Sequence, residues 1–143
     1  MPAPSMARDG CRSVLLVEDE PLVMDLVTNV LTRSGFAVIP TVDGDEAGRL
    51  FREHAAKLCL VVVNIALPKT SGLEFIEELP TRDPRIPVIF ITGLGEQQTL
   101  VRQALDEGYA VLQKPFTAEK LLDFMLNAMS EQRDAAAGDN PCP

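Results

Sequence analysis

The feature of the sequence that most constrains the fold is a run of six apolar residues, 58–63 (LCLVVV), which ends abruptly at the amide Asn64. An apolar run of this length without alternation is typical of a strand covered on both faces, as at the centre of a parallel sheet. Pro68 cannot donate to a strand ladder, and residues 69–72 (KTSG) have the composition of a loop. Asn64 is therefore predicted at the carboxyl end of a central parallel strand, where open α/β sheets bind their ligands.

Strand and helix patterns alternate along the rest of the chain. Apolar runs at residues 13–17, 36–39, 88–91 and 110–113 predict four more strands, the second one closed by Pro40. Amphipathic segments that start near residues 21, 44, 72, 96 and 118 predict a helix after each strand. Strict alternation with right-handed crossovers predicts a doubly wound α/β fold, a parallel sheet with helices on both faces.

The predicted domain spans residues 13–130. Residues 1–12 are polar and contain two prolines, so we expect a flexible lead. Residues 131–143 are small and polar, and we expect a disordered tail there. With no effector domain expected on this chain, its output would pass through another molecule.

Composition excludes several classes of function. The net charge of −8 disfavours binding to nucleic acid or to an anionic membrane, because both are held mainly by Lys and Arg. No apolar run approaches the roughly 18 residues of a membrane-spanning helix, and the amino terminus does not resemble a signal peptide. The three cysteines lie far apart and form no CxxC pair, so we expect a reducing cytoplasm, with Cys59 as a core residue.

Polar residues follow the predicted strands at their carboxyl ends. Glu18-Asp19-Glu20 follow the first strand, Asn64 ends the third, Thr92-Gly93 follow the fourth and Lys114 follows the fifth. In a parallel sheet these ends lie along one edge, so we expect the side chains to converge. Carboxylate oxygens suit Mg²⁺, a threonine hydroxyl can donate to a phosphoryl oxygen, and a lysine balances its charge. The pattern predicts a site for a divalent cation and a phosphoryl group.

At these positions residues 12–130 resemble the receiver domain of two-component response regulators. The resemblance rests on four motifs: Val17-Glu18-Asp19-Glu20, Asn64-Ile65-Ala66-Leu67-Pro68 with Gly72, Thr92-Gly93, and Lys114-Pro115-Phe116. It implies a flavodoxin-like (βα)5 fold with strand order 2-1-3-4-5 and a cis Lys114-Pro115 bond. It also implies a metal site formed by Glu18, Asp19, Asn64 and the carbonyl of Ala66. A histidine kinase or an effector is the implied protein partner, bound by the last two helices and the fifth strand.

Two departures from the family pattern decide the functional hypothesis. The family's phosphate acceptor is an aspartate, whereas an amide such as Asn64 is uncharged and cannot form the acyl phosphate. Losing that charge should also leave any Mg²⁺ site weak. Val111 stands where the family usually has a Tyr or Phe that moves inward on activation, and the segment from Gly108 to Lys114 looks one residue short.

The leading hypothesis is a stand-alone, atypical receiver domain in phosphorelay signalling that is not an enzyme, carries no organic cofactor and acts by protein contact. A homodimer is an open alternative to a different partner. One alternative function is a conventional regulator phosphorylated at Thr70 or Ser71. Another is a flavodoxin-like nucleotide-binding protein, although three acids after the first strand would repel a phosphate.

Less specific interpretations remain for single residues. Glu20 could complement the helix dipole, Asn64 could be a turn residue, and Lys114 could pair with Asp19 or hydrogen-bond to Asn64. His54, the only histidine, is predicted on an exposed helix face, which disfavours a phosphoryl-carrier role.

Overall fold

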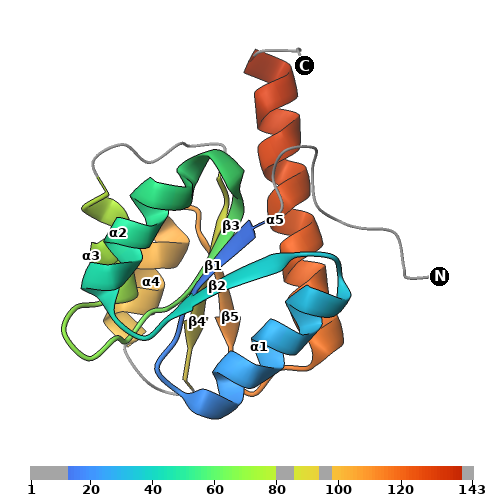
Figure 1. The fold of residues 1–143 in the computed structure, drawn as a ribbon. Helices are drawn as coiled ribbons and strands as arrows, with labels where there is room; N and C mark the ends of the chain where they lie inside the picture. Colours follow the sequence, from blue (N-terminus) through green and yellow to red (C-terminus); the bar gives the residue numbers. More distant parts are fainter. Residues whose placement is uncertain (1–12, 80–85, 94–97, 140–143) are drawn as a thin grey trace.

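The computed structural model describes residues 13–79, 86–93 and 98–139, with the backbone alone for residues 131–139. Its centre is a five-stranded parallel sheet in the order β2-β1-β3-β4-β5 (Figure 1). The predicted doubly wound fold and strand order are therefore confirmed. The strands are β1 (Ser13–Val17), β2 (Ala37–Thr41), β3 (Leu58–Asn64), β4 (Val88–Thr92) and β5 (Ala110–Gln113).

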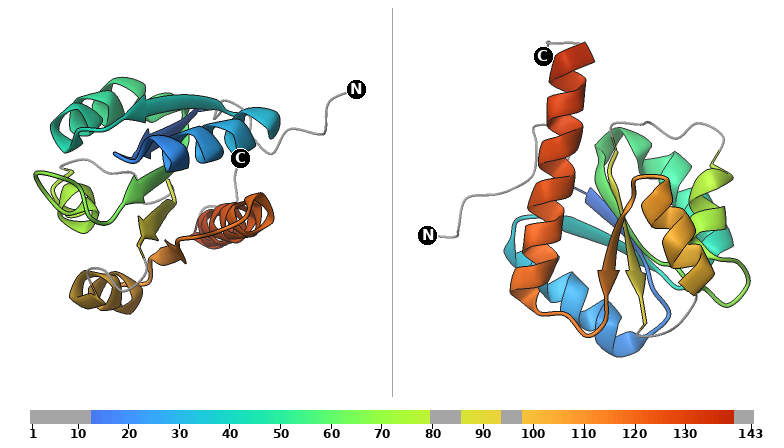
Figure 2. Two further views of the ribbon diagram at one scale, coloured as in Figure 1. Left: turned by 90° about the horizontal axis from the view of Figure 1, so that it is seen from below. Right: turned by 180° about the vertical axis from the view of Figure 1, so that it is seen from behind.

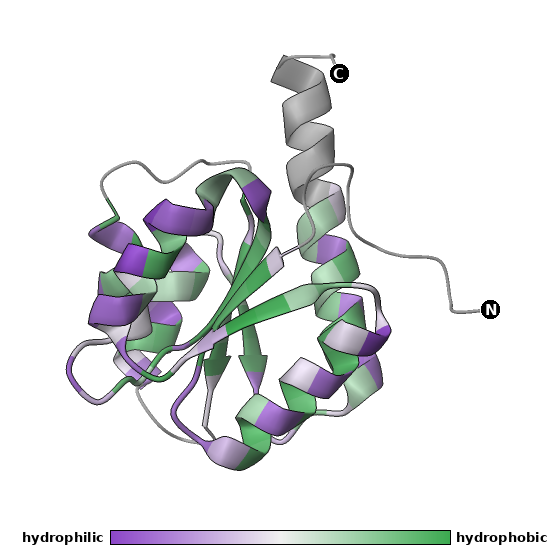
Figure 3. Cartoon of the chain, viewed as in Figure 1, coloured by the Kyte–Doolittle hydropathy of each residue, from purple (hydrophilic) through white to green (hydrophobic). Residues whose placement is uncertain are grey.

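Helices cover both faces of the sheet (Figure 2). One apolar core lies between the sheet and α1 (Pro21–Arg33) with α5 (Ala118–Asp139). A second core lies between the opposite face and α2 (Gly44–His54), α3 (Gly72–Glu77) and α4 (Gln98–Asp106). A short 3-10 helix, η1 (Ala55–Lys57), leads from α2 into β3. The sheet is thus the apolar middle layer, as the hydropathy colours show (Figure 3).

The central strand β3 has the predicted burial on both faces. All seven of its residues are buried, with Leu60 and Val62 in the first core and Val61 and Val63 in the second. Because full burial of one aliphatic side chain contributes roughly 1.5–3 kcal/mol, this strand is a large part of the stabilisation. Cys59 is a core residue as predicted, and its thiol donates to the Ser13 carbonyl at 3.3 Å.

The second strand is longer than predicted. The predicted strand ends at Pro40, whereas β2 continues through Pro40 to Thr41. Proline is tolerated there because β2 is an edge strand that, among the described residues, pairs only with β1, so the missing N–H needs no partner. The extension matters for the site, since the Thr41 carbonyl accepts the backbone N–H of Glu18 at 3.0 Å.

The last helix is also longer than predicted. The predicted domain ends at residue 130, whereas α5 continues to Asp139 and runs past the end of the sheet (Figure 1). Residues 135–137 are alanines, which have the highest helix propensity, and adding a turn to an existing helix needs no new nucleation. The predicted flexible lead at residues 1–12, and residues 140–143, lie outside the described residues. In the part of the chain that the structure describes, no helix has both the length and the apolar character to cross a membrane.

The loop between β3 and α3 generates a first prediction. Gly72 lies against the end of β3, and its N–H donates to the Ile65 carbonyl at 2.8 Å. A Cβ at Gly72 would press on the carbonyl oxygen of Asn64 and lie 3.1 Å from Cα of Ile65. Because both are backbone atoms at the strand end, Gly72→Ala should lower the free energy of unfolding by about 1–3 kcal/mol in urea titrations.

The matched control is Gly48→Ala in α2. A Cβ there meets only the far end of the Arg52 side chain, at 3.8 Å. Since alanine is the better helix former, this variant should gain about 0.5–1 kcal/mol. Equal stabilities for the two variants would contradict the close approach at Gly72.

Candidate functional site

The carboxyl edge of the sheet brings the predicted polar residues together. Glu18 follows β1, Asn64 ends β3 and Lys114 follows β5, and their side chains make direct contacts. Asp19 and Glu20 belong to the same cluster, through Asn64 and Lys114 respectively. The cluster therefore joins three strands that lie far apart in the sequence.

Glu18 is the buried centre of this cluster, with an exposed fraction of 0%. Its Oε2 atom accepts the backbone N–H groups of Asp19 and Glu20, each at 3.0 Å, and the amide of Asn64 at 2.9 Å. Its Oε1 atom is buried and has no hydrogen-bond partner, and the Lys114 ammonium lies 3.8 Å away. Among the described residues, the carboxylate thus has one well-bonded oxygen and one nearby cation, Lys114.

Burial raises the pKa of the Glu18 carboxyl above its ordinary value, because a desolvated carboxylate is costly. The hydrogen bonds from Glu20 and Asn64 and the charge of Lys114 lower that pKa and offset part of the effect. Taken together, these effects leave the pKa of Glu18 raised, so the carboxyl is protonated more readily in the protein than in water.

Asn64 connects the two acids that follow β1. Its Nδ2 atom donates to Oε2 of Glu18 at 2.9 Å and to Oδ1 of Asp19 at 3.2 Å. Its Oδ1 atom accepts the backbone N–H of Ala66 at 2.9 Å, which fixes the orientation of the amide. A carboxylate in its place would repel its neighbours by on the order of 5 kcal/mol per pair at an effective dielectric constant of about 20. The amide therefore suits two adjacent acids in a way that an aspartate does not.

Lys114 pairs with Glu20 and stays 3.8 Å from Glu18. The interpretation that Lys114 pairs with Asp19 or hydrogen-bonds to Asn64 is wrong. Its ammonium pairs with Glu20 instead, and the Asn64 amide donates the hydrogen bond to Asp19. The Lys114-Pro115 bond is cis, as the family resemblance implies. The backbone N–H of Lys114 donates to the Thr92 carbonyl at 2.8 Å, which ties it to the end of β4.

The side chains of Thr92 and His54 lie outside this hydrogen-bonded cluster. The Thr92 hydroxyl is buried and donates to the adjacent Gly93 carbonyl at 3.3 Å. His54, predicted as exposed, is half-buried at the last position of α2.

Sequence reasoning missed Thr41 as a positioning residue. Its carbonyl holds Glu18, and its hydroxyl donates to the Glu46 carboxylate at 2.5 Å. No sequence signal points to Thr41, since it follows a proline that suggested the end of the strand.

A Mg²⁺ ion at this edge of the sheet would require oxygen ligands. Among the described residues, no group of three or more His, Cys, Asp or Glu side chains could hold a metal ion. Asn64 turns its donor atom, not its oxygen, toward Glu18 and Asp19. Its oxygen is already bonded to the Ala66 N–H. In this conformation the donor set does not fit the ion.

Comparison with known proteins identifies the family. The sequence model described as the response regulator receiver domain matches residues 14–125. The chain belongs to the receiver domain family of two-component response regulators. It is 35% identical over 117 residues to the polar-differentiation response regulator DivK of Brucella anthropi, covering 78% of this chain and 91% of DivK.

Solved structures share the fold. A receiver domain protein from Clostridium thermocellum matches with a TM-score of 0.76 and 27% identity, covering 85% of this chain and 97% of that one. NtrX from Brucella abortus, in complex with ADP, matches with a TM-score of 0.80 and 26% identity, covering 93% of this chain and 30% of that one.

Several curated relatives are much longer than the matched region. The chain spans 26% of NtrX of Azorhizobium caulinodans, at 30% identity over 122 residues and 84% of this chain. It spans 27% of DctD of Pseudomonas aeruginosa and 47% of RppA of Synechocystis. Family membership therefore describes the receiver domain and not the activities of these whole proteins.

The raised pKa of Glu18 gives a prediction for pH dependence. A carboxyl whose pKa is higher in the folded state stabilises the protein at low pH, and this contribution is lost as pH rises through the raised value. Glu18→Gln removes that titration. The variant should therefore gain free energy of unfolding relative to wild type as pH rises from about 4 to about 8, measured by urea unfolding.

The exposed carboxylate of Glu119 at the start of α5 offers the control, Glu119→Gln, for a general change of net charge. A stability difference between wild type and Glu18→Gln that does not change with pH would show that the Glu18 pKa is not raised.

Proposed function

We propose that this chain is an atypical receiver domain that is not phosphorylated at the usual position and acts by contact with a protein partner, without enzymatic activity. The observation that carries this proposal is the amide of Asn64, which bridges Glu18 and Asp19. An acyl phosphate requires a carboxylate oxygen as nucleophile, and the Asn64 oxygen is both uncharged and bonded to the Ala66 N–H.

The same contacts support a cation-independent site. In our proposal the Asn64 amide takes over the role of a divalent cation, because it places two N–H dipoles between neighbouring carboxylates. Lys114 is held by Glu20, which supports a single arrangement of the cluster without a phosphoryl group. The state of the domain would then be set by its partner, which binds one conformation better than another.

The alternative of phosphorylation at Thr70 or Ser71 has little support. The Thr70 hydroxyl is buried, and the Ser71 hydroxyl accepts the Glu74 N–H at 2.9 Å at the start of α3. Neither hydroxyl is linked to a base by a hydrogen bond that the structure records. The alternative of a flavodoxin-like nucleotide-binding site has still less support. Glu18 to Glu20 stand where a phosphate loop would have to lie, and the chain belongs to the receiver family.

For the partner surface we propose α4, β5 and α5. Two large apolar side chains there are exposed: Leu105 of α4 at 54% and Leu126 of α5 at 51%. Exposed leucines on the two helices that flank β5 favour a protein partner, and the net charge of −8 disfavours nucleic acid or an anionic membrane. One relative, CckA of Brucella abortus, is a sensor kinase, and a histidine kinase or an effector is the class of partner that we propose. A homodimer through this surface is the alternative.

The first test is chemical. Incubation with Mg²⁺ and a small-molecule phosphodonor should leave the intact mass of wild type unchanged, because no nucleophile is available. Asn64→Asp should gain one phosphoryl group that is lost in mild base. Asn29→Asp, the same change on the exposed side of α1, should stay unlabelled. A stoichiometric, base-labile adduct on wild type would refute the proposal.

The second test measures the dependence on a cation. Asn64→Asp places a third carboxylate beside Glu18 and Asp19, so without Mg²⁺ its melting temperature should fall by about 5 °C or more. Millimolar Mg²⁺ should restore most of that loss and leave wild type nearly unchanged. A wild-type melting temperature that rises with Mg²⁺ as much as that of the variant would show that Asn64 does not replace the cation.

A further inference from the structure

The strand β5 is an edge of the sheet, since it pairs with β4 on one side only among the described residues. It lies between α4 and α5, and both helices contact it (Figure 2). An edge strand presents a row of unpaired N–H and C=O groups, which makes it a template for another extended chain.

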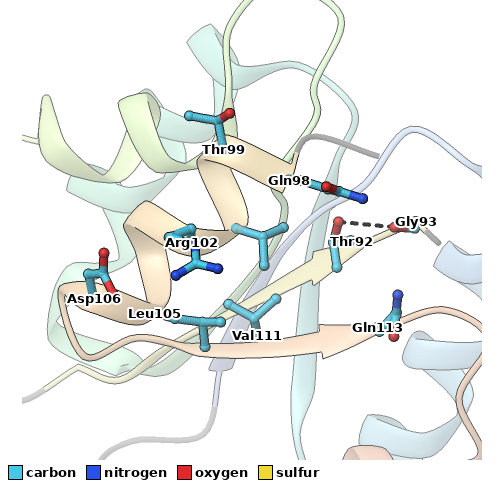
Figure 4. A pocket seen from close by; sticks show the side chains of 10 residues that line it. Thr92, Gly93, Gln98, Thr99, Arg102, Leu105, Asp106, Val111 and Gln113 are labelled. Carbon is cyan, nitrogen blue, oxygen red and sulfur yellow. Dashed lines mark hydrogen bonds between the residues drawn. The ribbon is translucent and has the colours of Figure 1, made fainter. Parts of the chain in front are cut away.

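One groove runs between β5 and α4. Its volume is about 820 Å³, and its apolar wall is formed by Val101, Leu105 and Val111. Arg102 lies beside Leu105 and Val111, while Thr92 and Gln113 line the end at the carboxyl edge (Figure 4). The apolar wall suits a large apolar side chain, and the volume exceeds that of any single one.

A second groove runs between β5 and α5. Its volume is about 490 Å³, and it is lined by Phe116 and Phe124 together with Lys120. The Lys120 ammonium lies 5.8 Å from the centre of the Phe124 ring. No acidic residue lines this groove among the described residues. Its charge therefore favours an acidic side chain with an apolar stem.

The two grooves share Val111 and Gln113, so they flank the same edge strand on its two faces. Successive side chains of a strand point to opposite faces. A segment added beside β5 would therefore place neighbouring residues alternately toward the two grooves. Main-chain hydrogen bonds with pockets for alternate side chains are the means by which sheet edges bind peptides.

We propose that β5 binds an extended segment of a partner protein by strand addition, and that this segment carries a large apolar residue next to an acidic one. The proposal rests on the proposed function, action by protein contact, and names the binding mode and the chemistry of the partner. Arg102 and Lys120, one on each groove, form no ion pair among the described residues. Asp106 also lines the α4 groove, whereas no acid lines the α5 groove among the described residues, so the acidic residue is assigned to the α5 groove, beside Lys120.

A second copy of this chain fits the edge less well. Paired strands lie about 4.8 Å apart, whereas packed helices need about 8–10 Å between their axes. Because α4 and α5 both flank β5, a second domain would bring its own flanking helices too close to them. A single extended segment has no such helices.

The probe is a fluorescent peptide of about eight residues in which Val and Phe alternate with Glu, measured by fluorescence anisotropy with the full chain. Two further peptides carry N-methyl groups on alternate amides, one set for each edge of the peptide strand. One N-methylated peptide should bind at least about tenfold more weakly, since it loses hydrogen bonds to β5, while the other should bind like the parent. Backbone amide shifts should be confined to β5, α4 and α5.

Protein variants locate the site. Lys120→Glu should weaken the parent peptide by about fivefold, and Lys57→Glu, an exposed lysine of η1, should leave its affinity unchanged. Val111→Trp should occupy the part of the α4 groove beside β5 and weaken binding. If this variant does not fold, the exposed Lys120→Glu change and the N-methylated pair still decide.

Two peptide results would overturn the proposal: no binding at millimolar peptide, or equal binding of both N-methylated peptides. Amide shifts centred on α1 would also overturn it, as would sedimentation showing that the chain alone dimerises through β5. None of them bears on the mass test at Asn64, so failure of strand addition and failure of the proposed function are distinguishable.

Discussion

A buried carboxylate beside a second acid is the constraint on which this site depends. Glu18 has no exposed surface, and Asp19 follows it directly, so the pair needs a partner with positive character. The amide of Asn64 supplies it with two N–H groups, and the Ala66 N–H holds the amide in place. Lys114 balances the remaining charge through Glu20. A neutral residue thus stabilises an acidic cluster that an aspartate at the same position would make repulsive.

The sheet positions these groups. The neighbouring strands β1 and β3 end side by side, which brings Glu18 and Asn64 within hydrogen-bond distance. The edge strand β2 contributes the carbonyl of Thr41, which holds the Glu18 backbone. The close approach of Gly72 fixes the turn after β3 against the strand end. Side chains from distant parts of the sequence therefore meet because their strands are parallel and end at one edge.

If the domain is not phosphorylated, as we propose, it needs another way to change or report its state. We propose that the far edge of the sheet offers it, because among the described residues β5 pairs with β4 alone and has a groove on each face. Thr92 links this edge to the acidic cluster: it lines the α4 groove, and its carbonyl accepts the Lys114 N–H. A segment bound at β5 would thus lie next to the residues that hold Lys114.

The sequence by itself determined the fold class, the strand order through the family resemblance, and the set of polar residues at the strand ends, because apolar runs, alternation and residue type are local properties. It also determined that Asn64 cannot act as a carboxylate nucleophile. Only the tertiary structure decided that Asn64 bridges both acids, that Lys114 pairs with Glu20, and that Thr41 holds Glu18. It likewise decided the continuation of β2 through Pro40 and the grooves beside β5. Which side chains pair with one another depends on distances between segments that are remote in sequence. Those distances exist only once the sheet has formed.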